Sequence, residues 1–226
     1  MTTRIGLISD VHSSPVALAE ALQIFADQQV DDIICAGDIA GYYDTLLPTI
    51  RLLVRADCKT IIGNHDQSWL EKNTSQYKAV DGRPDSSPDS SSANSQDSSE
   101  IRSYLQQLPQ TLELVVEGKR LFVVHANPPS EQHGGIKLRD RYGNIVAERK
   151  ADWTQSLADL QHDVLIVGHT HQVYAEQLGP VLVINPGSVP FNHSCMVLSL
   201  PDLRVETYAL GDREIIRSWN FSMQQG

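Results

Sequence analysis

The sequence contains few cysteines. Cys35, Cys58 and Cys195 are the only three in 226 residues, and no two of them form a Cys-x-x-Cys pair. A thiolate zinc site is therefore not expected, because such sites use closely spaced cysteine pairs. The odd count argues against a disulfide framework, so we expect three reduced and mostly buried thiols.

Long apolar segments are also missing. No stretch approaches the roughly 20 consecutive apolar residues that a membrane-spanning helix requires. Residues 1–10, MTTRIGLISD, have no long apolar run after their basic residue, and we interpret them as a first strand rather than a signal peptide. We therefore expect a cytoplasmic protein that has no membrane partner.

Positive charge is scarce. Lys and Arg number 18 against 28 Asp and Glu, which gives a formal net charge of −10. Proteins that bind long nucleic acids present a basic surface, so no such partner is expected. A small phosphorylated substrate remains compatible with this charge, because bound metal ions supply positive charge locally. The sequence favours no particular oligomeric state.

The chain length suits one large domain over residues 1–226. In the first part, helical spacing follows Ser14-Pro15 and recurs between residues 46 and 54. Three short apolar segments predict buried strands around these helices: 5–9, 32–36 and 59–62. This strand-helix-strand-helix-strand order predicts a parallel sheet with right-handed crossovers.

Residues 81–100, DGRPDSSPDSSSANSQDSSE, interrupt this pattern. Ser, Asp and Pro dominate, and Ala93 is the only apolar residue of the segment. Such a stretch cannot bury enough area to offset its ordering entropy. We predict a disordered Ser-rich insertion, with a phosphorylated or partner-binding segment as the alternative.

Ordered elements are expected again from Ile101. The patterns predict a helix at 101–108, a hairpin of 112–117 and 120–124, a loop at 126–150, a helix around 153–160, and strands at 164–167, 195–200 and 204–209.

Five short polar motifs follow the predicted strands. They are Asp10-Val11-His12, Gly37-Asp38, Gly63-Asn64-His65-Asp66, His125, and Gly168-His169-Thr170-His171. Ligands of open α/β sheets bind beyond the strand ends, so these motifs are expected to converge there. Imidazole, carboxylate and amide groups suit divalent metals. The glycines are expected to allow tight turns before the ligands.

Spacing indicates how these side chains could share a cavity. Asp10 and His12 are separated by one residue, as are His169 and His171, and residues i and i+2 of an extended segment point to the same side. Asp38 could bridge two cations. Taken singly, three of the motifs are weak: Asp-x-His commonly forms a solvated loop, Gly-Asp a turn, and a lone histidine a packed or capping residue. Gly168-His169-Thr170-His171 is more specific, because two histidines at i and i+2 after a buried strand are uncommon as core residues. Their joint occurrence after apolar strands favours a metal site.

The order DxH, GD, GNHD, single His and GHxH resembles that of the calcineurin-like metallophosphoesterases, from Ile5 to about Ser188. Residues 38–42 and 185–188 resemble the small bacterial and archaeal phosphodiesterase-like branch, which is related to the Vps29 scaffold proteins. The resemblance implies an α/β fold, a four-layer α-β-β-α sandwich of two mixed sheets. Ser13 and Ala126 replace glycines that are common in this family, which bears on the shape of the substrate.

The resemblance also implies roles for individual residues. It implies that one divalent metal binds Asp10, His12, Asp38 and His171, and that the other binds Asp38, Asn64, His125 and His169. His65 would bind the phosphate and protonate the leaving group, with Asp66 orienting it. Mn²⁺ is the expected metal, with Fe, Ni or Zn as alternatives.

The expected activity is hydrolysis of a phosphodiester or phosphomonoester, with a metal-bridging hydroxide attacking phosphorus in line. The alternatives are a phosphoprotein or nucleotide phosphatase, and a non-catalytic binding scaffold like Vps29. Five cations in the predicted loop could bind a phosphate or form a solvated surface: Lys137, Arg139, Arg141, Arg149 and Lys150. His133 of the same loop could touch the substrate, although a surface histidine is the simpler interpretation.

Overall fold

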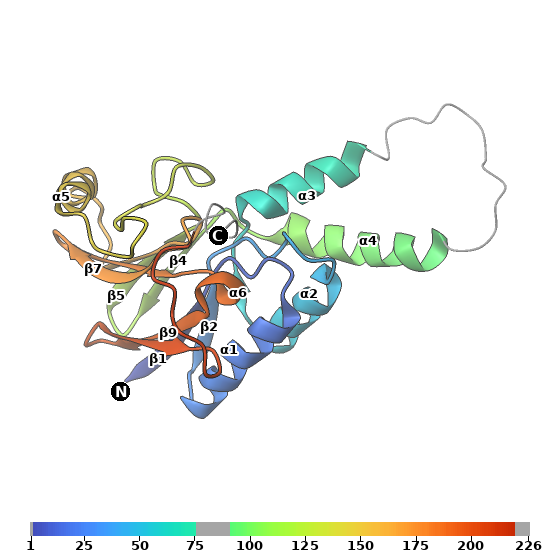
Figure 1. Cartoon of the computed structure of the whole chain (residues 1–226), viewed down its shortest axis with the longest axis horizontal. Coiled ribbons are helices and arrows are strands. Elements are labelled where there is room, and N and C mark those ends of the chain that lie inside the picture. Colours follow the sequence, from blue (N-terminus) through green and yellow to red (C-terminus); the bar gives the residue numbers. More distant parts are fainter. Residues whose placement is uncertain (1, 76–90, 220–226) are drawn as a thin grey trace.

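Two mixed sheets form the centre of the protein. The computed structural model describes residues 2–75 and 91–219 (Figure 1). The first sheet has the order β10-β9-β1-β2-β3. Its strands are β1 (Thr3–Ile8), β2 (Asp32–Cys35), β3 (Lys59–Thr60), β9 (Ser194–Leu200) and β10 (Arg204–Ala209). Strands β1, β2 and β3 are parallel, as predicted, whereas β9 and β10 run antiparallel to their neighbours.

The second sheet has the order β4-β5-β6-β8-β7. Its strands are β4 (Thr111–Val116), β5 (Lys119–Val124), β6 (Val164–Ile166), β7 (Val173–Leu178) and β8 (Val181–Pro186). The predicted hairpin is confirmed, because β4 pairs antiparallel with β5 around Glu117-Gly118. Strands β5, β6 and β8 are parallel and lie at the centre of this sheet, whereas the parallel strands of the first sheet extend to its β3 edge.

The sheets pack face to face through apolar side chains that alternate along the strands. Ile5 and Leu7 of β1 meet Val123 of β5 and Ile166 of β6 in one buried cluster. Ile8, one position beyond Leu7, points instead into the cluster on the opposite face of the first sheet. This alternation follows from the two-residue period of a strand.

Helices cover the two outer faces (Figure 1). The helices are α1 (Pro15–Asp27), α2 (Leu46–Arg55), α3 (Asn64–Ser75), α4 (Ser91–Gln107), α5 (Ala147–Ser156) and α6 (Val189–Asn192). Helices α1, α2 and α4 cover the first sheet, and the side chains around α5 and the preceding loop cover the second. The four-layer sandwich of two mixed sheets is therefore confirmed.

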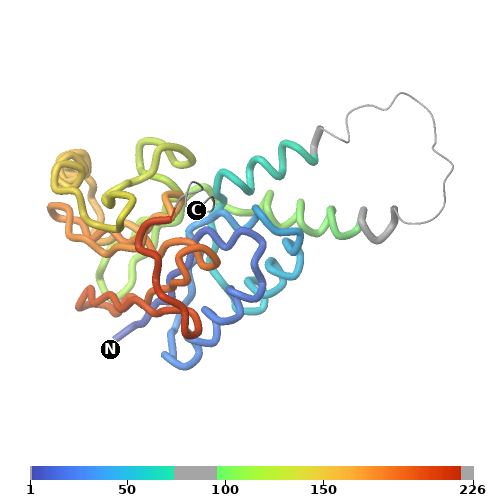
Figure 2. Tube along the Cα trace, in the orientation of Figure 1, coloured from blue at the N-terminus to red at the C-terminus, as the bar shows by residue number. Residues whose placement is uncertain are grey.

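Helices α3 and α4 form a hairpin that projects from the body of the protein (Figure 2). The prediction of disorder is wrong for residues 91–100, which belong to α4, while residues 81–90 lie outside the described residues. Ile101 and Leu105 anchor the C-terminal part of α4 in the core. Adding a residue to an anchored helix costs little free energy, because each added residue forms one more backbone hydrogen bond. An ion pair of 2.8 Å between Glu100 and Arg51 of α2 also holds this part of α4 in place.

Candidate metal centre

The candidate ligands lie beyond the carboxyl ends of parallel strands from both sheets. Asp10 and His12 follow β1, Asp38 follows β2, and Asn64 follows β3. His125 follows β5, and His169 and His171 follow β6. Backbone hydrogen bonds join the loops, since Asp10 N–H donates to Gly37 O at 2.9 Å and Gly168 N–H donates to His125 O at 2.8 Å. The five motifs therefore converge, as predicted.

One group of ligand atoms comes from Asp10, His12 and His171. His12 Nε2 lies 3.0 Å from His171 Nε2. Asp10 Oδ1 lies 3.4 Å from His171 Nε2 and 3.9 Å from His12 Nε2. All three side chains are buried, so water does not compete freely for these atoms.

A second group comes from Asp38, His125 and His169, with Asn64 between them. Asn64 Oδ1 lies 2.8 Å from His169 Nδ1 and 3.0 Å from His125 Nε2. His125 Nε2 is also 3.2 Å from Asp38 Oδ2. Asp38 belongs to this group and to a further group with His12 and His65, so its carboxylate lies between the two clusters.

Hydrogen bonds on the far side of two rings direct lone pairs into the site. His12 Nδ1 bonds to Ala40 O at 3.1 Å, and His125 Nδ1 bonds to Ala36 O at 2.7 Å. A carbonyl oxygen only accepts, so both Nδ1 atoms carry protons, and Nε2 is the atom of each ring that offers a lone pair to a cation when the ring is neutral. Ligands bound at 2.0–2.2 Å to one cation lie about 3 Å apart. The donor set therefore fits two cations.

Electrostatics favours protonation states that suit metal binding at three ligands. Burial lowers the pKa of His12 and of His169 to about 4 each, so both imidazoles are neutral at neutral pH. Burial would raise the pKa of Asp10, but the nearby His171 holds it below its usual value. His125 differs: burial opposes its charge, yet the adjacent Asp38 carboxylate raises its pKa to about 10.

The expected extended geometry of the His and Asp pairs is wrong. Asp10, His12, His169 and His171 have positive φ angles of 51°, 47°, 65° and 49°. The pairs therefore converge through left-handed turns, not through a strand. His169 and His171 also belong to different clusters, so this one short segment contributes a ligand to each group.

Two of the motif glycines are required by close approach and not by turn geometry. Gly37 has a φ of +93°, as expected for a turn, whereas Gly63 and Gly168 have no positive φ. A Cβ atom on Gly63 would collide with the Asp38 carboxylate. A Cβ atom on Gly168 would collide with Ser9 Oγ and lie 2.7 Å from Asp10 Oδ2. The absence of these side chains lets the ligand loops pack together.

His65 lies at the start of α3, beside the candidate ligands. Its backbone N–H donates to Asp38 Oδ1 at 2.8 Å, and its ring centroid lies 4.9 Å from that of His12. The side chain is half-buried and lines the pocket over the ligands. This position is compatible with the expected contact to a phosphate.

Asp66 occupies a different position from the one expected. Its Oδ1 accepts from Ala40 N–H at 2.7 Å and its Oδ2 from Gly63 N–H at 2.8 Å. Within the described residues, its hydrogen bonds go to these backbone groups and not to His65. Burial, together with the nearby Asp38, raises the pKa of Asp66 to about 7. Asp66 therefore joins the loop after Asp38 to the first turn of α3.

A pocket of about 210 Å³ opens over the ligands. Its lining residues are Asp38, Tyr42, Asn64, His65, Lys137, His169, Thr170, His171 and Trp219. Sequence reasoning missed Trp219, whose backbone N–H donates to His171 O at 3.1 Å and whose ring stacks on Phe191 at 4.2 Å. No local pattern could reveal this contact, because the fold alone brings residue 219 back to the site. His133 is exposed and does not line this pocket.

None of the helices in the described part of the chain combines the length and apolar character needed to cross a membrane.

Comparison with known proteins gives relatives that cover most of the chain. The chain is 25% identical over 185 residues to the uncharacterized protein MJ0912 of Methanocaldococcus jannaschii, covering 82% of this chain and 69% of that protein. It is 22% identical over 190 residues to the phosphodiesterase MJ0936 of the same organism, covering 81% and 82%.

Solved structures show the same fold. The crystal structure of a metallophosphoesterase from Sphaerobacter thermophilus matches with a TM-score of 0.62 at 22% identity, covering 93% of this chain and 89% of that one. The family model of the calcineurin-like phosphoesterase superfamily domain matches residues 3–200. Members of this superfamily typically bind divalent metals, and the chain belongs to it, as the order of its motifs implied.

Proposed function

We propose that the protein is a phosphoesterase that binds two divalent cations and hydrolyses a phosphodiester or phosphomonoester. The observation that carries this proposal is the position of Asp38 between two ligand clusters: it groups with His125 and His169 on one side and with His12 on the other. Asp10, His12, Asp38 and His171 would hold one cation, and Asp38, Asn64, His125 and His169 the other. Carboxylate, amide and imidazole ligands without thiolate are compatible with Mn²⁺, with Fe, Ni or Zn as alternatives.

Two bound cations would supply an activated water nucleophile and neutralise charge on the phosphoryl group. The residues of the chain would orient the substrate for this reaction. His65 lines the pocket beside the ligands and would donate a proton to the leaving oxygen. The buried walls formed by Asp10 and His12 would limit water around the reacting group.

The phosphodiesterase among the relatives supports ester hydrolysis, although its identity of 22% is low. A binding scaffold is the competing hypothesis from another class. Loss of catalysis in a scaffold leaves no selection for a complete ligand set, whereas all seven ligand positions here carry metal-binding side chains. The complete set therefore favours the enzyme.

Asp38→Asn tests the shared ligand. Metal content would be measured after reconstitution with Mn²⁺, and turnover would be measured with aryl phosphodiesters and aryl phosphomonoesters. We expect loss of metal from both clusters and loss of turnover, because Asp38 lies between them. Asp44→Asn is the matched control, since Asp44 is an exposed carboxylate six residues further along the same loop. Normal turnover in Asp38→Asn, or a wild-type protein inactive with each of the metals, would overturn the proposal.

A further inference from the structure

The loop between β5 and α5 and the start of α5 carry five cations, four of which have partners within the protein. Arg139 donates through Nε to Val173 O at 2.8 Å and through Nη1 to Gly143 O at 2.6 Å. Arg149 donates to Arg139 O at 2.6 Å, and Lys150 pairs with Glu176 at 2.6 Å. Arg141 bonds to the hydroxyl of Tyr142 and lies over its ring. These four therefore hold the loop in place or pair at the surface.

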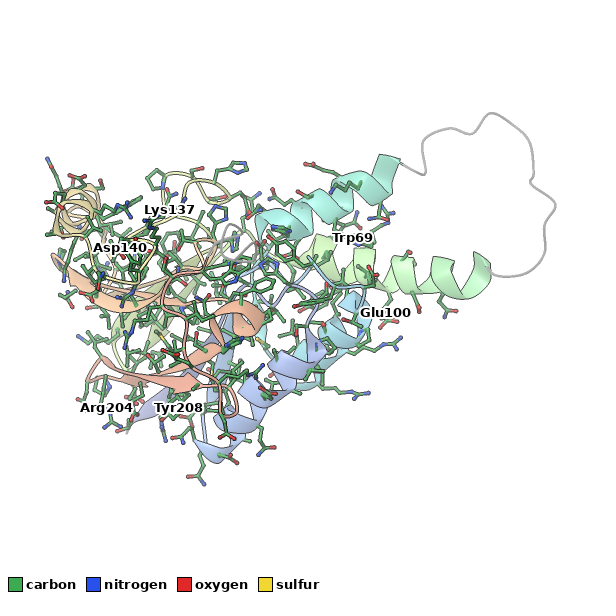
Figure 3. All side chains as sticks on the ribbon, in the orientation of Figure 1. Trp69, Glu100, Lys137, Asp140, Arg204 and Tyr208 are labelled. Atoms are coloured by element: carbon green, nitrogen blue, oxygen red, sulfur yellow. The ribbon has the colours of Figure 1, made fainter. Side chains whose placement is uncertain are left out.

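Lys137 is the exception. Its side chain is exposed, and it forms no ion pair or side-chain hydrogen bond with any described residue. It lines the 210 Å³ pocket together with His65, His169 and Thr170. Of the described residues that line this pocket, it is the only Lys or Arg. Figure 3 labels Lys137 in the loop that precedes α5.

The backbone on both sides of Lys137 is fixed. Ile136 O accepts from the hydroxyl of Tyr174 at 2.9 Å, and Leu138 N–H donates to Gln172 Oε1 at 2.9 Å. Ile136 and Leu138 are fully buried in the cluster beneath the loop. Because these neighbours cannot move without breaking buried contacts, the Lys137 side chain extends from a defined point at the pocket rim.

The preceding glycine brings this point close to the candidate ligands. Gly135 has a φ of +70°, and a Cβ atom there would collide with Thr170 and lie 2.9 Å from the His169 ring. The loop therefore packs directly on the segment that carries two of the ligands. A bulkier residue at position 135 would move Lys137 away from the pocket.

We propose that Lys137 binds a terminal oxygen of the substrate phosphoryl group and makes the site selective for phosphomonoesters over phosphodiesters. The inference rests on the proposed phosphoesterase function. A monoester dianion has one more terminal oxygen and one more negative charge than a diester. Lys137 is the pocket residue that offers a matching positive charge, and an ammonium group is a good partner for a phosphate oxygen.

Lys137→Met removes the charge and keeps most of the side-chain length. Inorganic phosphate would be titrated into the Mn²⁺-loaded protein by calorimetry, and kcat/KM would be measured for an aryl phosphate and for the corresponding diaryl phosphate. We expect phosphate affinity and monoester kcat/KM to fall at least about tenfold, as for loss of a charged hydrogen bond, with diester kcat/KM changed much less. Lys137→Arg should recover part of the loss.

Arg141→Met is the control, because Arg141 is an exposed cation of the same loop that lines a different pocket. It should behave as the wild type in both measurements. Unchanged phosphate affinity in Lys137→Met, or equal loss for both esters, would overturn the role of Lys137. A wild type that turns over neither ester would refute the proposed function instead, and the phosphate titration would still decide whether Lys137 binds the anion.

Discussion

The Nε2 atoms of His12 and His171 lie 3.0 Å apart although the residues are 159 positions apart in the sequence. The bond from His12 Nδ1 to Ala40 O leaves the lone pair of His12 on Nε2, facing the other ring. Such an arrangement is stable only when a proton or a cation lies between the two nitrogens. Binding of a cation between these two nitrogens should therefore stabilise the fold, and this stabilisation should depend on pH.

We expect Mn²⁺ to raise the melting temperature at pH 7.5 and chelation to reverse this. The shift should shrink toward pH 5.5, because a cation must displace a proton from His125, whose pKa is raised to about 10, and that proton is harder to displace as the pH falls. Thermal melts with and without Mn²⁺ at both pH values provide the measurement.

The matched variants for this experiment are His171→Ala and His133→Ala. His171→Ala should lose most of the Mn²⁺-dependent shift. His133→Ala should keep it, since His133 is exposed and does not line the pocket. An equal shift at both pH values would argue against histidine ligation.

His65→Ala should retain both metals and lose turnover. General acid catalysis contributes about 10²–10⁴-fold to rates, so kcat should fall within that range. The loss should be larger for a phenyl ester than for a nitrophenyl ester, because the better leaving group needs less protonation. Metal analysis and kcat for the two esters test this, and an equal loss with both esters would assign His65 a role other than proton donation.

Asp66→Ala should destabilise the fold more than it alters the chemistry. Two buried N–H groups, those of Ala40 and Gly63, would lose their acceptor. An unsatisfied buried group costs about 1–3 kcal/mol, so urea unfolding should show a loss of about 2–6 kcal/mol. Asp44→Ala, at an exposed position, should change stability by less than about 0.5 kcal/mol. Similar stabilities for the two variants would contradict the structural role of Asp66.

Gly168→Ala should reduce metal binding at the cluster of Asp10, His12 and His171. The added Cβ would displace Ser9 or the Asp10 carboxylate. Gly118→Ala is a useful comparison, since nothing lies within 4 Å of a Cβ there and only its φ of +75° is unfavourable. That variant should lose about 1 kcal/mol of stability and keep full metal content. Full metal content in Gly168→Ala would mean that the loops adjust without moving the ligand.

The order of strands and helices predicted the parallel strands of the first sheet and the convergence of the motifs, whereas the second sheet was implied by the family resemblance. Each motif follows a short apolar strand, and the order of strands and helices restricts where those strands can lie. Helix α3 was not predicted, because its residues 64–75 have little apolar periodicity and their helical form depends on α4 beside them. Helix α4 extends through the Ser-rich residues 91–100 because its C-terminal part is anchored in the core, which the composition of that segment does not reveal.

Within the candidate site, the ligand residues could be predicted from the sequence, but several contacts between distant segments could not. The Ala40 N–H donor to Asp66 could not be inferred, because Ala40 lies on another loop whose position only the fold defines. The same holds for Lys137, which differs from its four cationic neighbours in what surrounds it and not in any local sequence signal. Trp219 reaches the pocket through backbone contacts with His171 that no spacing rule anticipates.

Asp10, His12, Asp38, His169 and His171 all hold positive φ angles. A non-glycine residue in this conformation costs roughly 1–2 kcal/mol, and it persists only where its surroundings impose it. A short peptide that copied any of these motifs would relax to an ordinary backbone and lose the directions of its side chains. Grafting this centre onto another scaffold would therefore require transfer of the loops together with the strand ends that hold them.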